Sequence, residues 1–593
     1  MKILIMALNS KFIHTNLAIQ YLKTYYETYK CSDKSEVIVK EYTINNEMDN
    51  ILRDIYKDQY THIFVSAYIW NIEPLTILFS NFRKINQNCK IIFGGPEVTY
   101  NSVERLNNLS FLDAVICGEG EEIFVQLIRN IECFGELEGY KKTLGISYKS
   151  IEGIVENPPM PLIEPLDKIP FPYEDLSYFE NRILYYESSR GCPYSCTYCL
   201  SSAVQGLRHL STERVLEDMR YFLKHNIPQV KFVDRTFNAK KRHALPILKF
   251  LVENDNGITN FHFEITATLL DDDYYDVLKM ARSGLFQFEI GVQTTYQPTM
   301  VAIHRPVEFE KLKSVCLTLL QMGGIHLHLD LIAGLPYEDF ERFQKSFDEV
   351  YAIGADQVQL GFLKLLNGTS LSNNREMHGY VVRNETPYEV LSNNYISYEA
   401  LSTLKEMEIL LESYSNSGKF KNSLRYLMRK LEGTPSGFFM WLRNHYLEMR
   451  YYDAPVGTYR LYEILYEAYT KQFGESDLFR DLLKVDYYFS NLKGQKPLFN
   501  YVEIPNFNNC RINALNDLLI QDKHLSQFST VSARQLLKNV EFITLKYDIM
   551  SIIQKGFEDE PEKLSVVMFD YTDIHSYRII AIDMKYFESS NEY

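Results

Sequence analysis

The sequence has few cysteines, no low-complexity tract and no long apolar run among its 593 residues. Its longest apolar stretches, such as Ile63–Trp70, fall far short of the roughly 20 residues that cross a bilayer. Near the start, Asn9, Ser10 and Lys11 follow Lys2–Leu8, where a signal peptide would have its small-residue cleavage site. We therefore expect a globular protein without a membrane span, located in the cytoplasm.

An excess of basic residues is also absent. The 62 lysine and arginine residues, against 77 aspartate and glutamate residues, give a net charge of −15. This balance disfavours a phosphate-binding surface over the whole protein, although a local basic cleft is compatible with it. We therefore do not expect nucleic acid as a partner. The length predicts roughly three to five domains of about 100–200 residues each.

Nine cysteines are too few for a disulfide scaffold, but three of them fall close together. Cys192, Cys196 and Cys199 have the spacing CxxxCxxC directly after a predicted strand at Leu184–Ser188. Three thiolates in one loop suit three irons of a 4Fe–4S cluster and leave its fourth iron open. A structural zinc site with His209 as fourth ligand is the alternative. The other six cysteines are scattered singly, and we interpret them as structural.

Residues 1–135 alternate buried strands with amphipathic helices, which predicts a doubly wound, Rossmann-like parallel sheet. The predicted strands are Lys2–Leu8, Glu36–Tyr42, His62–Ser66, Lys90–Phe93 and Ala114–Cys117. Ligands of such sheets bind outside the carboxyl ends of the strands. Polar or glycine-rich loops follow the strands there, at Asn9–His14, Ser66–Tyr68, Gly94–Glu97 and Gly118–Glu121.

Three further regions follow. Residues 136–180 are predicted to be a connector, because the six prolines between residues 158 and 172 disfavour a helix. Residues 181–384 contain six strand–helix units, which predict a central partial (β/α)6 TIM-like barrel with its chemistry at the carboxyl ends of the strands. Its predicted strands are Leu184–Ser188, Gln229–Asp234, Phe261–Thr266, Leu285–Ile290, Ile325–Ile332 and Gln357–Phe362. Residues 385–593 are predicted to be a mostly helical domain with a small β element at Leu564–Phe569 and Tyr577–Ile582.

The cysteine spacing, the aromatic Tyr198 and the position after a first strand resemble the radical S-adenosylmethionine (SAM) enzymes. In that family the open iron binds the amino and carboxylate groups of SAM, and one-electron reduction yields methionine and a 5′-deoxyadenosyl radical. Residues 290–294 and 331–336 resemble the motifs of the fourth and fifth barrel strands. The resemblance implies Tyr198, Asp234, Glu264, Gln293 and Gly334 as SAM-binding residues.

The first domain is similar to the cobalamin-binding domain that precedes many radical SAM barrels, as in the magnesium-protoporphyrin cyclase-like class. The resemblance implies cobalamin contacts at Asn9, Ser10, His14, Ser66, Tyr68, Gly94, Gly95, Glu97, Gly118, Glu119 and Gly120. Relatives that ligate cobalt through histidine carry a DxHxxG motif, and His14 lacks the acid of that motif. We therefore expect cobalamin without a histidine ligand from the protein. The look-alike Asp573-Ile574-His575 lacks the glycine, and we interpret it as unrelated.

The resemblance implies a cobalamin-dependent radical SAM enzyme that methylates or rearranges an unknown small molecule or peptide. Its cofactors would be a 4Fe–4S cluster, SAM and cobalamin, with an external one-electron reductant such as flavodoxin or ferredoxin. One alternative is a radical SAM methylthiotransferase, which would need a second cluster on three N-terminal cysteines. Cys31, Cys89 and Cys117 do not share strand-end loops. The other alternative is a non-catalytic cobalamin or redox sensor. The C-terminal domain has no function that its sequence identifies.

Overall fold

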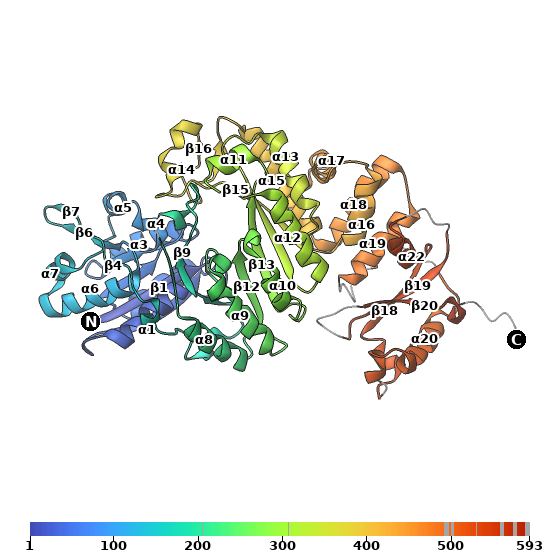
Figure 1. The fold of residues 1–593 in the computed structure, drawn as a ribbon, viewed down its shortest axis with the longest axis horizontal. Coiled ribbons are helices and arrows are strands. Elements are labelled where there is room, and N and C mark those ends of the chain that lie inside the picture. Colours follow the sequence, from blue (N-terminus) through green and yellow to red (C-terminus); the bar gives the residue numbers. More distant parts are fainter. Residues whose placement is uncertain are drawn as a thin grey trace. The chain divides into compact units, whose positions relative to one another are not determined.

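The computed structural model describes all residues except 204–205, 306, 491–496, 500–502, 529, 558–561, 573–577 and 588–593. The look-alike motif at residues 573–575 thus lies outside the described residues. The chain divides into two compact units, Met1–Leu401 and Ser402–Tyr593, which are described separately (Figure 1). Within the described part of the chain, no helix combines the length and the apolar character needed to cross a membrane.

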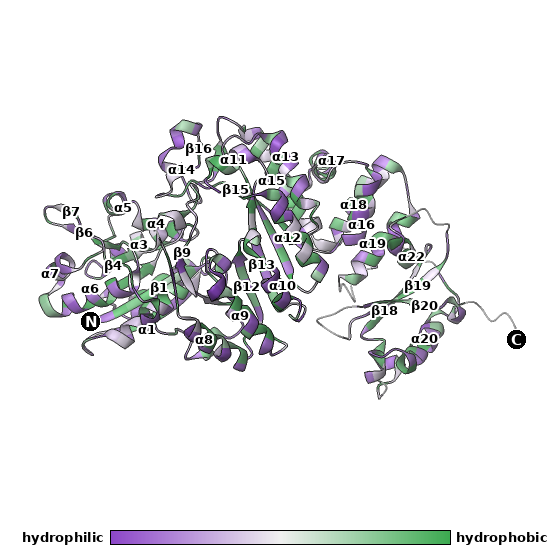
Figure 2. Cartoon of the chain, viewed as in Figure 1, coloured by the Kyte–Doolittle hydropathy of each residue, from purple (hydrophilic) through white to green (hydrophobic). Residues whose placement is uncertain are grey.

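The first unit begins with a seven-stranded sheet of order β2-β1-β3-β4-β5-β6-β7. Its strands are β1 (Lys2–Asn9), β2 (Glu36–Thr43), β3 (His62–Ser66), β4 (Lys90–Gly94), β5 (Ala114–Ile116), β6 (Ile146–Ser150) and β7 (Gly153–Glu156). The first five are parallel, which confirms the predicted sheet. The strand order reverses between β1 and β3, and ligands of such sheets bind at that switch point. Figure 2 shows the apolar character of β1, whose residues 3–8 are fully buried.

Helices connect these strands. They are α1 (Leu17–Tyr29), α2 (Met48–Lys57), α3 (Ile72–Ile85), α4 (Pro96–Thr99), α5 (Ser102–Asn108), α6 (Gly120–Phe134) and α7 (Glu136–Lys142). The side chain of Asn16 caps α1 by accepting a hydrogen bond from the Ile19 amide. Strands β6 and β7 are antiparallel and extend the sheet past residue 135, where the prolines predicted a connector. The extended segment therefore begins only after Glu156.

The second half of this unit is a six-stranded parallel sheet in chain order, β8-β11-β12-β13-β14-β15. The strands are β8 (Leu184–Tyr186), β11 (Gln229–Phe232), β12 (Asn260–Ile265), β13 (Phe286–Gln293), β14 (His326–Ala333) and β15 (Gln357–Phe362). The connecting helices include α8 (Thr212–Lys224), α9 (Lys241–Glu253), α10 (Asp272–Leu278), α12 (Phe309–Met322) and α13 (Phe340–Tyr351). All six predicted strands are present, because each is a short apolar run that a helix follows.

The cysteine loop is enclosed by a small antiparallel pair, β9 (Ser189–Gly191) and β10 (Leu207–His209). Gly191 has a φ of +95°, and a Cβ atom there would lie 1.9 Å from the Gly206 carbonyl oxygen. Only glycine fits this position, since any side chain would force the two strands apart. The glycine thus fixes the start of the cysteine loop.

The first unit ends with the antiparallel pair β16 (Val381–Val382) and β17 (Val390–Ser392). Helix α15 (Tyr398–Leu410) crosses the boundary between the units. The second unit contains helices α16 (Lys421–Lys430), α17 (Pro435–Glu448), α18 (Thr458–Phe473), α19 (Asp477–Phe489) and α20 (Phe507–Gln521). Its antiparallel sheet joins β18 (Val540–Leu545), β19 (Ser565–Asp570) and β20 (Arg578–Ile582). The predicted small β element is confirmed, with β18 as a strand that the sequence did not indicate.

Candidate functional site

A cavity of about 780 Å³ lies at the carboxyl ends of the first sheet. It is close to the upper end of the range for small-molecule pockets, about 300–1,000 Å³. Of the residues expected to contact cobalamin, those that line it are Asn9, Ser10, His14, Tyr68, Gly95, Gly118 and Glu119. Residues of the half that contains the six-stranded sheet, among them Tyr185, Glu187, Arg190 and Arg235, also line it. The two halves of the first unit therefore build this cavity together.

Four residues of the cobalamin prediction are absent from the described lining, and each has a structural role. Ser66 is buried, and its carbonyl accepts a hydrogen bond from Asn71 Nδ2 at 3.0 Å. Gly94 packs against Ile116, and Gly120 begins α6. The Glu97 carboxylate accepts hydrogen bonds from Arg105 Nη2 and Tyr388 Oη, each at 2.5 Å. Their role toward cobalamin stays a prediction.

Gly95 shows why the loop after β4 needs glycine. Its φ is +107°, and a Cβ atom there would lie 2.5 Å from the Ala67 carbonyl oxygen. The glycine thus permits close approach of two strand-end loops, in addition to lining the cavity.

The aromatic side chains of this cavity were only partly predicted. The Tyr68 and Trp70 rings are stacked, with centroids 4.3 Å apart and planes 8° from parallel. Trp70 Nε1 donates a hydrogen bond to the Leu8 carbonyl at 3.3 Å. Such flat apolar surfaces suit a large planar ligand, so the lining fits a corrin ring. Trp70 has no sequence signal beyond its place shortly after the β3 loop.

His14 contacts β8 of the six-stranded sheet. Its Nδ1 atom lies 2.7 Å from the Tyr185 hydroxyl in a hydrogen bond. Partial burial lowers the pKa of the imidazole, and the nearby Lys11 lowers it further. One ring nitrogen of His14 therefore has a partner within the protein. That His14 is not a cobalt ligand stays a prediction.

A second cavity, of about 160 Å³, contains the cysteine loop. The residues of the cluster and SAM predictions that line it are Cys192, Cys196, Cys199, Tyr198, Glu264 and Gln293. The loop is tightened by a hydrogen bond from the Cys199 amide to the Cys196 carbonyl at 3.1 Å. The structure thus gathers the predicted thiols and most of the predicted SAM contacts around one space.

The donor set fits an iron–sulfur cluster. Three soft thiols face one cavity, and His209 of the zinc alternative is not among its described lining residues. Burial raises the pKa of the Cys196 thiol, and the guanidinium of Arg305, whose Nη1 lies 3.8 Å from Cys196 Sγ, opposes that rise. Within the described ranges, no three His, Cys, Asp or Glu side chains already stand at metal-binding spacing. The fit therefore rests on the shared cavity and on the chemistry of the thiols.

Two residues of the SAM prediction lie outside the described lining of this cavity. Asp234 is 1% exposed, and its carboxylate accepts hydrogen bonds from the Ser188 amide at 2.9 Å and from the Ser189 hydroxyl. It thereby holds the segment that leads into the cysteine loop. The Gly334 carbonyl accepts hydrogen bonds from Tyr380 Oη at 3.1 Å and Asn393 Nδ2 at 2.9 Å. Direct SAM contact by either residue stays a prediction.

The second cavity has an acidic wall that the sequence reading missed in part. Glu264, Glu289 and Asp330 come from the adjacent strands β12, β13 and β14. Glu289 accepts a hydrogen bond from Lys231 at 3.2 Å and lies 2.9 Å from His262 Nε2, and the pKa of its carboxyl falls to about 2. Burial raises the pKa of Asp330 to about 8. The alternation of polar and apolar residues along each strand was the available signal.

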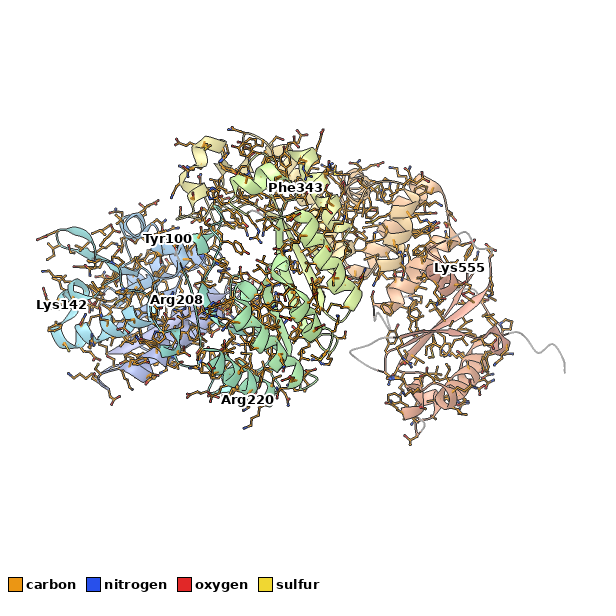
Figure 3. The ribbon with its side chains drawn as sticks, viewed as in Figure 1. Tyr100, Lys142, Arg208, Arg220, Phe343 and Lys555 are labelled. Atoms are coloured by element: carbon orange, nitrogen blue, oxygen red, sulfur yellow. The ribbon has the colours of Figure 1, made fainter. Side chains whose placement is uncertain are left out.

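Buried ion pairs join the two halves of this site. The Arg190 guanidinium on β9 contacts Glu121 Oε1 at 2.5 Å, Glu187 Oε2 at 2.8 Å and Glu119 Oε1 at 3.4 Å. Arg208 on β10, labelled in Figure 3, contacts Glu119 Oε1 at 2.5 Å. Glu119 and Glu121 follow β5, whereas Arg190 precedes the first cysteine by two positions. This interdomain network therefore links a loop of the first sheet to the cysteine loop.

The two cavities are neighbours. Ser201 and Arg235 line both of them. A ligand in the large cavity and a ligand at the cysteine loop would therefore face a common space.

Three family models match the chain in succession. Residues 3–128 match the B12 binding domain, residues 186–350 match the radical SAM superfamily, and residues 376–569 match a protein of unknown function, DUF4080. The first two matched ranges include the two sets of cavity-lining loops.

Similar curated proteins include an uncharacterized methyltransferase of Pyrococcus horikoshii, 28% identical over 49% of this chain and 63% of that protein. The cobalamin-dependent radical SAM methyltransferase TokK of Streptomyces tokunonensis is 23% identical over 54% of this chain and 49% of its own length. An anaerobic magnesium-protoporphyrin IX monomethyl ester cyclase of Rubrivivax gelatinosus is 22% identical over 45% and 49%, respectively. The chain thus spans about half to two thirds of the length of these relatives.

Solved structures share the fold. The cobalamin-dependent SAM radical enzyme OxsB matches 95% of this chain and 82% of its own, with a TM-score of 0.57 and 14% identity. The radical SAM methyltransferase TsrM from Kitasatospora setae matches 62% and 73%, with a TM-score of 0.53 and 16% identity. The predicted α/β architecture is thereby confirmed. The chain combines a B12-binding domain, a radical SAM domain and a C-terminal DUF4080 domain, and the first two imply cobalamin, a 4Fe–4S cluster and SAM as its cofactors.

Proposed function

We propose that this protein is a cobalamin-dependent radical SAM methyltransferase that acts on a small molecule or a peptide. The observation that carries the proposal is the adjacency of the two cavities, which share Ser201 and Arg235 as lining residues. A methyl donor and a radical source must both reach one substrate atom, so the substrate has to lie between them. The similar proteins named as methyltransferases support the same reaction class.

The residues of the second cavity would have distinct roles. Cys192, Cys196 and Cys199 would hold the cluster, while Tyr198, Glu264 and Gln293 would contact SAM. When bound, the cluster and SAM supply a one-electron route to hydrogen abstraction, and cobalamin supplies the methyl group. Asp234 would be a positioning residue, because its hydrogen bonds with Ser188 and Ser189 hold the segment before the cysteine loop.

In the first cavity, the stacked Tyr68 and Trp70 rings would exclude water from one side of the cobalamin. The network around Arg190 would keep the cysteine loop at a fixed position relative to the cobalamin loops. We further propose that the enzyme resides in the cytoplasm and receives its electrons from a flavodoxin or ferredoxin. The functional regions would be the predicted ones, 1–135, 136–180, 181–384 and 385–593, with β6 and β7 added to the first.

No structural observation favours the methylthiotransferase alternative. Cys31 is exposed after α1, Cys89 is buried before β4, and the Cys117 thiol lies 3.7 Å from the Ser147 hydroxyl. These thiols have separate surroundings, and none lines the two cavities described above. A rearrangement instead of a methyl transfer, or a sensor without catalysis, would use the same cofactors and is separated from methylation by product analysis.

The test is anaerobic purification and cluster reconstitution with cobalamin present, followed by absorption spectra and iron, sulfide and cobalt analysis. The unchanged protein should hold one 4Fe–4S cluster and one cobalamin. Cys196→Ala should lose the cluster absorbance and the formation of 5′-deoxyadenosine while keeping its cobalamin. Cys316→Ala is the matched control, since Cys316 is buried on α12 away from the described cavity linings. Loss of cobalamin alone in Cys196→Ala would contradict the assignment of the two cavities.

A further inference from the structure

Arg235 has an unusual position in this site. It lies three residues after the end of β11 and lines both the large cavity and the cavity of the cysteine loop. Its side chain is exposed into this space, whereas the flanking Asp234 and Thr236 are buried. The guanidinium is therefore available to a ligand placed between the two cofactor cavities.

The other arginines that line the two cavities are already engaged. Arg190 and Arg208 pair with Glu119, and Arg190 also pairs with Glu121. Arg305 Nη2 donates a hydrogen bond to the Gly291 carbonyl at 2.7 Å. The charges of Arg190 and Arg208 are therefore satisfied by carboxylates. Arg305 is held by the Gly291 carbonyl and lies beside the Cys196 thiol, at 3.8 Å, so it belongs to the cysteine loop.

The guanidinium of Arg235, in contrast, makes no hydrogen bond or ion pair with any residue in the part of the chain that the structure describes. Only its backbone carbonyl has a partner, the Thr236 hydroxyl, at 2.7 Å. The positive charge of Arg235 acts on residues of both cavities. Burial raises the pKa values of Tyr68 in the large cavity and of Glu264 in the small one, and the charge of Arg235 opposes both increases. A guanidinium without a partner presents a planar fork of donors that matches an oxyanion. A cation left at the junction of two cavities is thus suited to a ligand that brings its own negative charge.

The surroundings indicate which oxyanion fits. Glu264, Glu289 and Asp330 line the small cavity, and Glu119, Glu121 and Glu187 line the large one. Basic side chains already pair with Glu119, Glu121 and Glu289, so the single guanidinium of Arg235 is left to balance one negative charge. A monoanionic carboxylate matches that charge, whereas a dianionic phosphate would bring an unbalanced second charge close to Glu264. The charge distribution therefore favours a carboxylate.

We propose that Arg235 binds a carboxylate group of the substrate at the junction of the two cavities, so that the substrate is a carboxylic acid. This inference rests on the proposed function, since it assumes that the substrate lies between the two cofactors. SAM also has a carboxylate, but the family resemblance places that group on the open iron of the cluster. Arg235 would then orient the substrate by one charged end while the reacting carbon faces both cofactors.

The test uses crystals of the full-length protein loaded with cobalamin, cluster and SAM. They are soaked at saturation with 4-bromobenzoate, with the neutral 4-bromobenzamide or with 4-bromophenyl phosphate, and bromine is located by its anomalous scattering. We expect 4-bromobenzoate to bind with its carboxylate on Arg235, and neither the amide nor the phosphate ester to bind there. Arg235→Gln should lose the bromine site, and Arg242→Gln, which removes an exposed arginine outside both linings, should retain it.

The electron-density maps of these crystals would overturn the assignment of Arg235 as a substrate-binding residue in three cases: if Arg235 contacts the carboxylate of SAM, if it contacts cobalamin, or if no anion binds to it. Equilibrium dialysis supplies a second measurement: Arg235→Gln should change the SAM dissociation constant less than about threefold, and a weakening above about tenfold would identify SAM as the ligand of Arg235. Failure of the proposed function is separable, because it would appear as missing density for cobalamin or SAM in the unsubstituted protein.

Discussion

The carboxyl group of Glu187 is both buried and paired with Arg190, and these two features shift its pKa in opposite directions. Glu187 follows β8 and lines the large cavity, where burial raises its pKa to about 6 although Arg190 opposes that rise. The carboxylate accepts a hydrogen bond from Arg190 Nε at 2.8 Å. The raised pKa means that the folded protein binds a proton at this site more tightly than the unfolded chain does.

This shift predicts a pH dependence of stability. The proton bound by Glu187 stabilises the folded protein. This stabilisation is complete when the pH is below the pKa of the unfolded chain, near 4.5, and it is lost as the pH rises through the folded pKa of about 6. The free energy of unfolding of the unsubstituted protein, relative to Glu187→Gln, should therefore fall by roughly 2 kcal/mol between pH 4.5 and 7. Denaturant titrations of both proteins across this range measure it. A difference that grows with pH would mean that Arg190 outweighs burial.

His14 allows a spectroscopic prediction. Its Nδ1 atom is hydrogen-bonded to the hydroxyl of Tyr185 on β8, so the ring is held toward the six-stranded sheet. The electron paramagnetic resonance spectrum of bound cob(II)alamin should show no splitting from a histidine nitrogen, and His14→Ala should leave that spectrum unchanged. A nitrogen splitting that disappears in His14→Ala would overturn this reading.

At the scale of elements, the interdomain network connects the loop after β5 to β9. The side chains of Arg190 and Glu121 are 13% and 7% exposed, so removal of one partner leaves a buried charge without compensation. Arg190→Gln should destabilise the first unit by about 3–5 kcal/mol and weaken cobalamin retention. Arg190→Lys should recover part of the loss, because it restores the charge but not the planar fork.

A double-mutant cycle of Arg190→Gln with Glu121→Gln distinguishes loss of the ion pair from a general effect on packing. If the two side chains act together, their coupling energy should be about 1–3 kcal/mol. Lys141→Gln, which removes an exposed cation on α7, is the control and should have little effect. Additive losses for Arg190→Gln and Glu121→Gln would show that the network does not tie the loops together.

The elements that the sequence predicted correctly are those with local signals. The strands β1, β3, β4 and β5 are short apolar runs before polar or glycine-rich loops, and the cysteine loop has a diagnostic spacing. The pairing of Arg190 with Glu121 joins residues 69 positions apart and has no local pattern. Strands β6 and β7 were missed because the prolines just after them dominated the interpretation of that region. The buried role of Asp234 likewise depends on contacts from another strand.

At the scale of the whole molecule, the DUF4080 match begins at residue 376, whereas the first compact unit extends to Leu401. The segment between them contacts the first domain. Tyr388 Oη donates a hydrogen bond to Glu97 Oε1 at 2.5 Å, across 291 positions of sequence, and accepts one from Arg105 Nη2 at 2.8 Å. The start of the DUF4080 region is therefore part of the cofactor-binding unit.

Tyr388→Phe removes these hydrogen bonds and keeps the ring. Since hydrogen bonds to charged groups contribute about 1.5–3 kcal/mol, the unfolding free energy of the first unit should fall by about 2 kcal/mol. Tyr398→Phe, at a residue that is 61% exposed, is the matched control and should be close to neutral. Equal effects of the two substitutions would show that the Tyr388 contact does not stabilise the unit.

A cobalamin-dependent radical methyltransferase requires two reactions of SAM, and we propose that this one chain performs both. The direct measurement is the simultaneous quantification of 5′-deoxyadenosine and S-adenosylhomocysteine from the reconstituted protein under reducing, anaerobic conditions. We expect both products, with 5′-deoxyadenosine lost in Cys196→Ala and S-adenosylhomocysteine lost when cobalamin is omitted. Persistent absence of 5′-deoxyadenosine, with cluster and SAM both bound, would contradict it.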